Sequence, residues 1–303
     1  MNTPVLLIFF NRKYVLRIIN ILRKRKVRNL YLASDGGRTE EEKEKIEHLR
    51  ESVKKAIDWE CDVHYRFSDT NQGCEWGPVN AINWVFEKEE ECIILEDDCV
   101  PEETFFDYCT ELLGRYKCDK RVWMISGECY LQDKSVFGDN DYTFSLRTDT
   151  WGWATWKRAW MKCDFKLKMW PIYKRDHVLE KSNYMIFYHE IAYMKEQLDN
   201  IFKKRDESIW DYQWRFHMLI NGGLCIIPRV NLINNIGWGE ESTHTKGSRL
   251  TVFDVETKPM KFPMKHPSAV IANGFFDKKY GELLSPPKKL KEKILAYIKE
   301  KIL

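Results

Sequence analysis

Apolar runs alternate with amphipathic stretches along the first 130 residues. The continuous run "PVLLIFF", Pro4 to Phe10, is typical of a strand buried on both faces, which favours a parallel sheet. Residues 14–26 then have apolar positions at helical spacing, and residues 29–37 form a second strand-like run that ends in an Asp-Gly-Gly turn signal. Runs of the same two kinds predict further strands at 61–69, 92–95 and 122–128, and helices at 39–57, 77–90 and 101–116. This repetition predicts an α/β fold with a mostly parallel central sheet flanked by helices.

The repetition weakens after about residue 130, where segments rich in Gly, Pro, Trp and polar residues begin. Helical patterns return at 184–205 and 208–221. We find no internal repeat and no low-complexity linker. We therefore interpret 1–283 as one domain with a regular half, 1–130, and an irregular half, 131–283, followed by a basic amphipathic helix at 284–303.

The amino-acid composition limits which binding partners and which cellular compartment we expect for the protein. Of the 303 residues 44% are hydrophobic, enough for a full core, and the net charge of +3 is too small to favour nucleic acid. The nine cysteines include no Cys-x-x-Cys pair, so we interpret them as reduced thiols of a cytoplasmic protein. The beginning of the chain is unlike a signal peptide, and no apolar run reaches the roughly 20 residues of a membrane helix.

The stretch "ECIILEDDCVP", residues 91–101, ends an apolar run in three carboxylates, Glu96, Asp97 and Asp98. Adjacent carboxylates repel one another unless a cation compensates their charge. Carboxylates are hard oxygen ligands that suit Mg²⁺ or Mn²⁺, so the triplet predicts a metal site. The alternative is a solvated loop whose acidic residues cap the next helix.

Polar residues also follow the other predicted strands, and parallel strands bring such ends to one rim, where ligands bind in this fold class. Asn11 and Arg12 follow the first strand, and Asp35 follows the second. An Asp at this edge can accept a hydrogen bond from a nucleotide base, although a plain Asp-Gly turn explains Asp35 equally well.

Four segments, "PVLLIFFNR", "SDGG", "NQGCEWG" and "IILEDDCVPEETFFDY", resemble in order and spacing the nucleotide-sugar half of GT-A (Rossmann-like) glycosyltransferases. The likeness is to enzymes with a Glu-Asp-Asp version of the DxD motif, such as inverting N-acetylglucosaminyltransferases and related bacterial transferases. It covers residues 4–130 and continues more weakly to about residue 245. The resemblance implies that residues 1–130 bind a nucleotide sugar and residues 131–283 bind an acceptor.

The resemblance also implies roles for single residues. Asp98 would bind the Mn²⁺ or Mg²⁺ held by the donor diphosphate, Asp97 would lie against the ribose, and Glu96 would support the nucleotide. Asp35 would face the base, flanked by Asn11 and Arg12.

The motif "TDTWGWATWKRAW" carries four tryptophans. Trp156 and Trp160 have the spacing of core residues on one helix. Trp151 and Trp153 flank Gly152, a residue that lets a ligand approach the backbone closely. We interpret Trp151 and Trp153 as contacts to the sugar, with burial in the core as the equal alternative. Related transferases have a comparable Gly-Trp segment near the sugar.

Sugar transfer with inversion needs one general base near the acceptor hydroxyl. The segment "SIWDYQWRF" offers Asp211 among aromatic residues, and it resembles the Trp-Asp…Arg stretch that carries the base in the transferases named above. It departs from that stretch because Tyr212 replaces a second acidic residue. An ordinary acid in the first turn of a helix is the alternative for Asp211, and Glu128 is a second candidate base.

The Gly-rich loop "GWGEESTHTKGS" resembles loops that close over the donor in transferases of this fold. His244 is a candidate metal ligand there, and Lys246 a candidate contact to the diphosphate. A surface loop is the alternative.

The helix predicted at 284–303 has one apolar face and many lysines, so it either packs on the domain or lies on an anionic membrane. Together these features predict a metal-dependent glycosyltransferase of surface polysaccharide or glycolipid synthesis. It would use a nucleotide diphosphate sugar and a saccharide or lipid-linked acceptor, in the cytoplasm or at the inner face of the membrane. A sugar nucleotidyltransferase and a carbohydrate-binding or inactive GT-A module remain alternatives.

Overall fold

The first apolar runs of the chain become adjacent parallel strands. The computed structural model describes residues 1–182, 188–204, 209–237 and 251–284. Within these ranges the strands are β1 (Val5–Phe9), β2 (Asn29–Ser34), β3 (Asp62–Phe67), β4 (Glu91–Glu96), β5 (Cys99–Pro101), β6 (Val122–Ser126), β7 (Tyr142–Ser145), β8 (Trp153–Trp156), β9 (Leu224–Pro228) and β10 (Ile233–Asn235).

Eight of these strands form one sheet in the order β3-β2-β1-β4-β8-β6-β9-β7, and β5 and β10 form a separate antiparallel pair. In the sheet β1 lies between β2 and β4 and runs parallel to both, with Leu7 opposite Leu32 on one side and Leu95 on the other. β8 runs antiparallel to both of its neighbours, β4 and β6, and β7 runs antiparallel to β9. The predicted α/β fold with a mostly parallel sheet is confirmed, and strands from both predicted halves belong to the same sheet.

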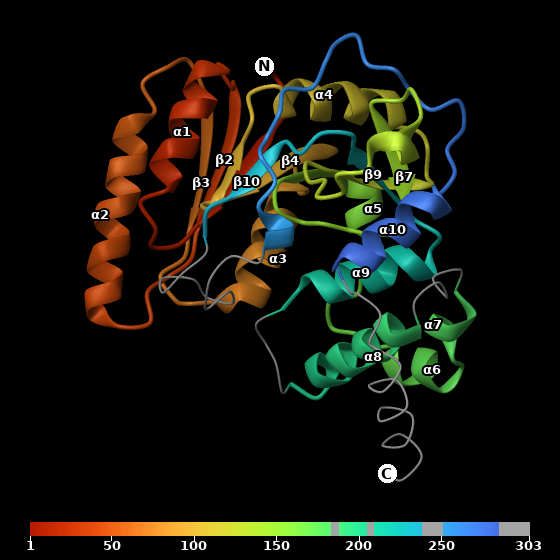
Figure 1. Ribbon diagram of the computed structural model, residues 1–303. Helices are drawn as coiled ribbons and strands as arrows, with labels where there is room; N and C mark the ends of the chain where they lie inside the picture. Colours follow the sequence, from red (N-terminus) through yellow and green to blue (C-terminus); the bar gives the residue numbers. More distant parts are fainter. Residues whose placement is uncertain (183–187, 205–208, 238–250, 285–303) are drawn as a thin grey trace.

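The described α-helices connect these strands and cover the sheet. They are α1 (Val15–Lys24), α2 (Glu40–Ala56), α3 (Gly73–Val85), α4 (Phe105–Tyr116), α5 (Lys157–Trp160), α6 (Trp170–Arg175), α7 (Val178–Lys181), α8 (Tyr188–Phe202), α9 (Asp211–Ile220) and α10 (Gly274–Leu284), with short 3₁₀ turns at Lys134–Phe137 and Thr251–Phe253. Figure 1 shows α1 and α2 beside β2 and β3, and α6 to α8 gathered at the end of the molecule away from α4.

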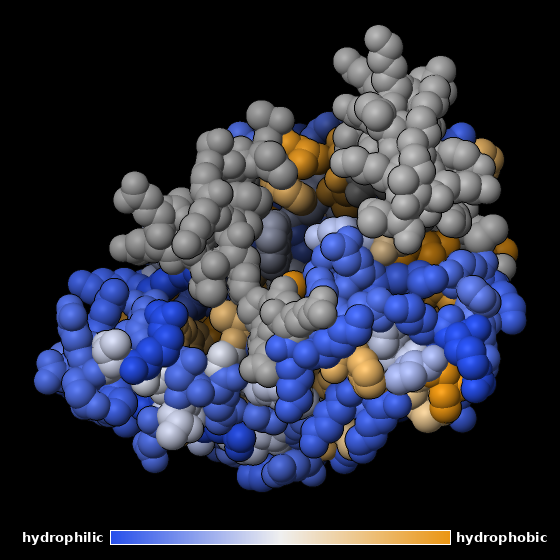
Figure 2. All heavy atoms as spheres, turned by 90° about the horizontal axis from the view of Figure 1, so that it is seen from below, coloured by the Kyte–Doolittle hydropathy of each residue, from blue (hydrophilic) through white to orange (hydrophobic). Residues whose placement is uncertain are grey.

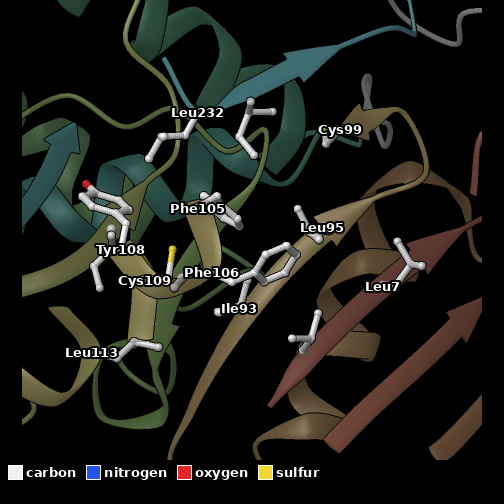
Figure 3. Close-up of a cluster of buried hydrophobic side chains, with 14 of the residues drawn as sticks. Leu7, Ile93, Leu95, Cys99, Phe105, Phe106, Tyr108, Cys109, Leu113 and Leu232 are labelled. Atoms are coloured by element: carbon white, nitrogen blue, oxygen red, sulfur yellow. The ribbon is translucent and has the colours of Figure 1, made fainter. Parts of the chain in front are cut away.

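Alternate residues of the strands pack against helices on opposite faces, as strand geometry requires. On one face, Leu7 and Leu95 belong to a buried cluster with α1, α2 and α4, part of which is shown in Figure 3. On the other face, Leu6 and Ile94 pack with apolar residues of α3, α5, α9 and α10. Both faces of the central strands are therefore covered, which explains why their sequences are continuously apolar.

Helices α6, α7 and α8 have their own small core, which they share with Phe216 and Leu219 of α9. In Figure 2 the described part of the face seen from below is mostly hydrophilic, and its hydrophobic residues form separate patches. No helix in the described ranges is long and apolar enough to cross a membrane. Most of the helix predicted at 284–303 lies outside the described residues.

Two details of the second half differ from the prediction. Trp156 is the last residue of β8 and Trp160 the last of α5, so the idea that one helix carries both is wrong, although both rings are buried. The pairing of β8 with β4 and β6 overrides the helical spacing of these tryptophans. In the first half the differences are smaller, and α3 begins at Gly73 rather than at residue 77.

Two glycines allow the chain to cross closely beside β10. The Gly127 N–H donates to the Gly152 carbonyl at 2.9 Å, and Ile233 of β10 packs against both residues. A Cβ on Gly127 would lie 2.6 Å from Ile233 Cγ1 and 2.7 Å from Phe105 Cε2. Gly152 has φ +69°, which favours glycine, and it would also clash with Ile233 if it carried a Cβ.

We therefore expect Gly127→Ala to lower the free energy of unfolding by about 1–3 kcal/mol, the usual cost of overpacking a core. Gly114→Ala is the matched control, because Gly114 lies within α4 and a Cβ there meets nothing within 4 Å. That control should stabilise the protein by up to about 1 kcal/mol. Urea denaturation of both variants measures the difference, and a Gly127→Ala protein as stable as wild type would show that Ile233 moves aside freely.

Candidate functional site

A cavity of about 780 Å³ opens where the parallel strands end. Its described lining includes Asn11 and Arg12 after β1, Asp35 after β2, and the triplet Glu96, Asp97 and Asp98 at the end of β4. Trp151 and Asp211 line it from the second half of the chain. The structure thus brings eight of the predicted site residues to one cavity, at the edge where ligands bind in α/β sheets.

The end of β4 is joined to the end of β1 by charge and by hydrogen bonds. The Phe10 N–H donates to Asp97 Oδ2 at 3.0 Å, and Arg12 Nη1 lies 3.4 Å from Asp97 Oδ1. The same Arg12 nitrogen forms an ion pair with Asp98 Oδ2. Asp97 and Asp98 are only 6% and 9% exposed, so Arg12 supplies the positive charge that two largely buried carboxylates need.

Glu96 faces a different side of the sheet. Ile94 packs toward α3 and Leu95 toward α1 and α4, so strand alternation places Glu96 on the α3 side. Burial raises the pKa of Glu96 to about 8, with further contributions from the charges of Asp98 and Asp97, while Arg12 lowers it and Asp211 raises it. Burial, followed by the charge of Asp98, raises the pKa of Asp97 to about 6. The three carboxylates are therefore not equivalent.

Helix capping does not explain the triplet. α4 begins four residues after Pro101, and the backbone N–H of its N-cap residue Thr104 donates to Glu102 Oε2 at 2.7 Å rather than to the triplet. The carboxylates of Asp97 and Asp98 point instead toward Phe10 and Arg12. This geometry leaves charge compensation as the reason for the cluster.

The residues of the site offer few ligands for a divalent cation. In the described ranges, no group of three or more His, Cys, Asp or Glu side chains is arranged to hold a metal ion. An ion bound mainly by a diphosphate needs only one or two carboxylates, which Asp98 can supply, although Arg12 already pairs with it. His244 and Lys246 lie outside the described residues. Mn²⁺ or Mg²⁺ at Asp98 stays a prediction.

Asp35 lines the cavity, but its hydrogen-bonding capacity is largely used by the chain. Its oxygens accept from the N–H groups of Gly36 at 2.9 Å, Gln72 at 2.8 Å and Gly73 at 2.9 Å, and from Asn71 Nδ2 at 3.1 Å. A carboxylate offers about four acceptor sites, so these contacts account for them. The Asp-Gly turn and the start of α3 explain Asp35, and we do not propose it as a contact to the base.

The part of the cavity lined by Asn11, Arg12 and Asp35 is its polar end. Three further residues, which the sequence pattern did not single out, also line the cavity: Arg38, Arg66 and Cys74. Arg38 lies over the Phe10 ring, 5.4 Å from its centroid, and pairs with Glu42, which also accepts from Asn11 Nδ2 at 3.2 Å. Arg38 directly follows the "SDGG" motif at the end of β2, and this position beside a strand end could have identified it as a candidate site residue.

Trp151 and Trp153 have different surroundings. Trp151 lines the cavity, whereas Trp153 is 1% exposed and is not found among the described residues that line it. The Trp153 ring stacks on Trp210 at 5.8 Å and packs against Trp160 and Trp214. The alternative of core burial therefore explains Trp153, which corrects its assignment as a sugar contact.

Asp211 is the first residue of α9 and lines the cavity together with Trp210 and Tyr212. Two buried contacts fix this helix start. Trp210 stacks on Trp153, and Gln213 Nε2 donates to Glu75 Oε1 of α3 at 3.1 Å. Asp211 is thus both an acid in the first turn of a helix and a carboxylate held at the cavity wall.

Glu128, the second candidate base, is 1% exposed and is not found among the described residues that line the cavity. Its Oε2 accepts the Trp151 N–H at 2.8 Å, and its Oε1 accepts the Tyr130 hydroxyl. These contacts place Glu128 behind the cavity wall, so its assignment as a base has no support from its position.

Comparison with known proteins gives distant likenesses only. No family model and no curated protein matches the chain. The chain is similar to the galactosyltransferase LgtC in complex with donor and acceptor sugar analogues, with 9% identity, a TM-score of 0.37, and coverage of 74% of this chain and 73% of that one.

It is also similar to TarS from S. aureus, with 13% identity, a TM-score of 0.35 and coverage of 52% and 47%. A cytidylyltransferase from Leptospira borgpetersenii gives 12% identity, a TM-score of 0.34 and coverage of 54% and 63%, so the match spans less than two thirds of that enzyme. With TM-scores this low, the likenesses assign neither a family nor an activity to this chain.

The pKa of Glu96 predicts a pH dependence of stability. Its value of about 8 in the folded chain exceeds the usual 4.5, so between these pH values the folded state holds a proton that the unfolded state releases. The contribution of Glu96 to the free energy of unfolding must then fall as pH rises through this window. Glu96→Gln removes this loss of stability, so the free energy of unfolding of the variant relative to wild type should rise by on the order of 4 kcal/mol from pH 5 to pH 8.5.

Chemical denaturation at a series of pH values measures this difference. Glu103→Gln, at an exposed position before α4, is the reference for loss of a carboxyl group. Parallel pH curves for Glu96→Gln and wild type would show that Glu96 is ionised in the folded protein at neutral pH.

Proposed function

We propose that this chain is a glycosyltransferase that moves a sugar from a nucleoside diphosphate sugar to a saccharide or lipid-linked saccharide. The observation that carries the proposal is that the Arg12–Asp98 pair and Asp211 line one and the same cavity. Such a cavity offers the guanidinium group of Arg12 to a departing diphosphate and a base to an incoming hydroxyl.

The polar end of the cavity suits the nucleotide. Arg12, Arg38 and Arg66 line it near the ends of β1 to β3, together with the side chain of Asn71. Guanidinium groups bind phosphate oxygens through charge-assisted hydrogen bonds. A volume of about 780 Å³ lies within the usual range for sites that enclose a small organic ligand.

The aromatic end suits the sugar and the acceptor. Trp151, Trp210 and Tyr212 line it beside Asp211. Their rings offer apolar faces with polar edges, which match the apolar faces and hydroxyl rims of sugar rings. The donor would therefore extend from the strand ends toward α9, with the transferred sugar between Trp151 and Asp211.

In this arrangement Asp211 takes the proton from the acceptor hydroxyl as the hydroxyl attacks the sugar. Arg12 holds Asp97 and Asp98 in place and meets the diphosphate as its negative charge grows. A divalent cation at Asp98, when bound, would supply Lewis-acid stabilisation to the same diphosphate. The transfer is assigned as inverting because one candidate base lines the cavity.

A screen of nucleoside diphosphate sugars with and without Mn²⁺ tests the proposal. One donor should raise the melting temperature, because a ligand that binds only the native state stabilises it. With acceptor present the protein should then release the free nucleoside diphosphate. Asp98→Asn should abolish the Mn²⁺-dependent part of this release, whereas Asp62→Asn, at an exposed site on β3, should not.

Other outcomes would contradict the proposal. Pyrophosphate release from a nucleoside triphosphate and a sugar phosphate would identify a nucleotidyltransferase. Binding of a donor or a saccharide without any release would identify a binding module. Equal activity of Asp98→Asn and wild type at limiting Mn²⁺ would end the metal assignment.

The role of Asp211 makes a separate prediction. Asp211→Asn should bind the donor as wild type does but transfer the sugar about 10²–10⁴-fold more slowly, because an amide cannot accept the proton of the acceptor. Calorimetry measures donor affinity, and nucleotide release in the presence of acceptor measures transfer.

Glu128→Gln is the control for this experiment, and it should keep most of the transfer rate because Glu128 lies behind the cavity wall. If Asp211→Asn is fast and Glu128→Gln is slow, the two roles must be exchanged. If both are fast, a retaining mechanism becomes the better assignment.

A further inference from the structure

The turn that carries Trp151 is held by hydrogen bonds to residues that are not among the described residues lining the cavity. Ser126 Oγ donates to the Asp149 carbonyl at 3.0 Å, and the Tyr280 hydroxyl of α10 donates to Asp149 Oδ2 at 2.7 Å. The Gly127 N–H donates to the Gly152 carbonyl on the other side of Trp151. Asp149, two residues before Trp151, and Gly152, directly after it, are therefore both held by partners distant in the sequence.

Glu128 contacts Trp151 directly, and it also contacts Trp151 indirectly through Tyr130 and Phe253. Its Oε2 accepts the Trp151 N–H at 2.8 Å, and its Oε1 accepts the Tyr130 hydroxyl. The Tyr130 ring meets the Phe253 ring edge-on at 5.1 Å, and Phe253 in turn meets the Trp151 ring at 5.6 Å. The backbone of Trp151 and its indole ring are thus fixed through the same buried carboxyl group.

We propose that Glu128 is a positioning residue that holds Trp151 in the wall of the cavity for the sugar. This role rests on the proposed function for its substrate, but the contacts that carry it are independent of the reaction. Glu128 acts through Trp151 and Tyr130 and needs no contact with the reacting atoms.

The surroundings of Glu128 indicate which replacements preserve this role. Burial, and next the charge of Asp149, raise the pKa of Glu128 well above its usual value, while the bonds from Tyr130 and Trp151 lower it. The side chain of glutamine has the shape of the Glu128 side chain and offers an oxygen to the Trp151 N–H. Glutamine should therefore replace Glu128, whereas methionine, of similar length, leaves the N–H without this acceptor.

Fluorine NMR of protein labelled with 5-fluorotryptophan tests the contact without any substrate. The Trp151 signal is assigned by its loss in Trp151→Phe. Glu128→Gln should keep this signal at its wild-type position, and Glu128→Met should shift or broaden it. Glu89→Met, which removes a carboxylate that accepts the Tyr31 hydroxyl just before β4, is the control and should leave the Trp151 signal in place.

Steady-state kinetics, with the donor that the nucleotide-sugar screen identifies, then test whether the position of Trp151 affects donor binding. Glu128→Met should raise KM for the sugar roughly tenfold, the effect of leaving one buried N–H unpaired, and Glu128→Gln should keep the wild-type KM. In a Trp151→Ala background, Glu128→Met should add no further loss, since its effect passes through Trp151.

Three results would overturn the proposal. The Trp151 signal could be the same in Glu128→Met and wild type. Glu128→Gln could fail to transfer sugar while its Trp151 signal is unchanged, which would make Glu128 a catalytic residue. The Trp151→Ala and Glu128→Met losses could also be additive. If no nucleotide sugar binds at all, the proposed function fails, and the NMR comparison still decides the role of Glu128.

Discussion

Three adjacent carboxylates at the end of a buried strand are the constraint on which the site depends. Asp97 and Asp98 are almost fully buried, and an unpaired buried charge is far more costly than a paired one. Arg12 and the Phe10 N–H meet that requirement, and in doing so they fix the end of β1 against the end of β4. Because β1 and β4 are neighbours in the sheet, these contacts hold the ends of both strands together at the cavity.

The part of the cavity that carries Asp211 is built by packing. Trp153, Trp160 and Trp214 form a buried group of rings, and Trp210 stacks on its edge where α9 begins. Asp211 follows Trp210 directly, so the position of a carboxylate depends on the stacking of its neighbour. The site combines an ion pair that joins two strand ends with a carboxylate whose placement is set by aromatic contacts.

The parts of this arrangement that sequence predicts are those set by local pattern. Runs such as Pro4 to Phe10 predict a strand and its burial, and the rule that parallel strands end at one rim brings Arg12 and Asp98 together. The roles of Asp35 and Glu128 are set by distant partners, Gln72 and Gly73 for one and Trp151 for the other. The sequence pattern does not indicate whether the oxygens of a carboxylate already accept hydrogen bonds within the fold. Both residues are therefore predicted as site residues until their contacts are known.

The place of β8 in the sheet has a consequence for how this chain is made. β8 lies between β4 and β6, but its residues come about thirty positions later in the chain than those of β6. Until they are synthesised, the facing edges of β4 and β6 have no strand between them, and bare strand edges favour association between chains. We therefore expect a fragment that ends near residue 130 to aggregate rather than to fold, so the two halves cannot be exchanged as modules between related proteins.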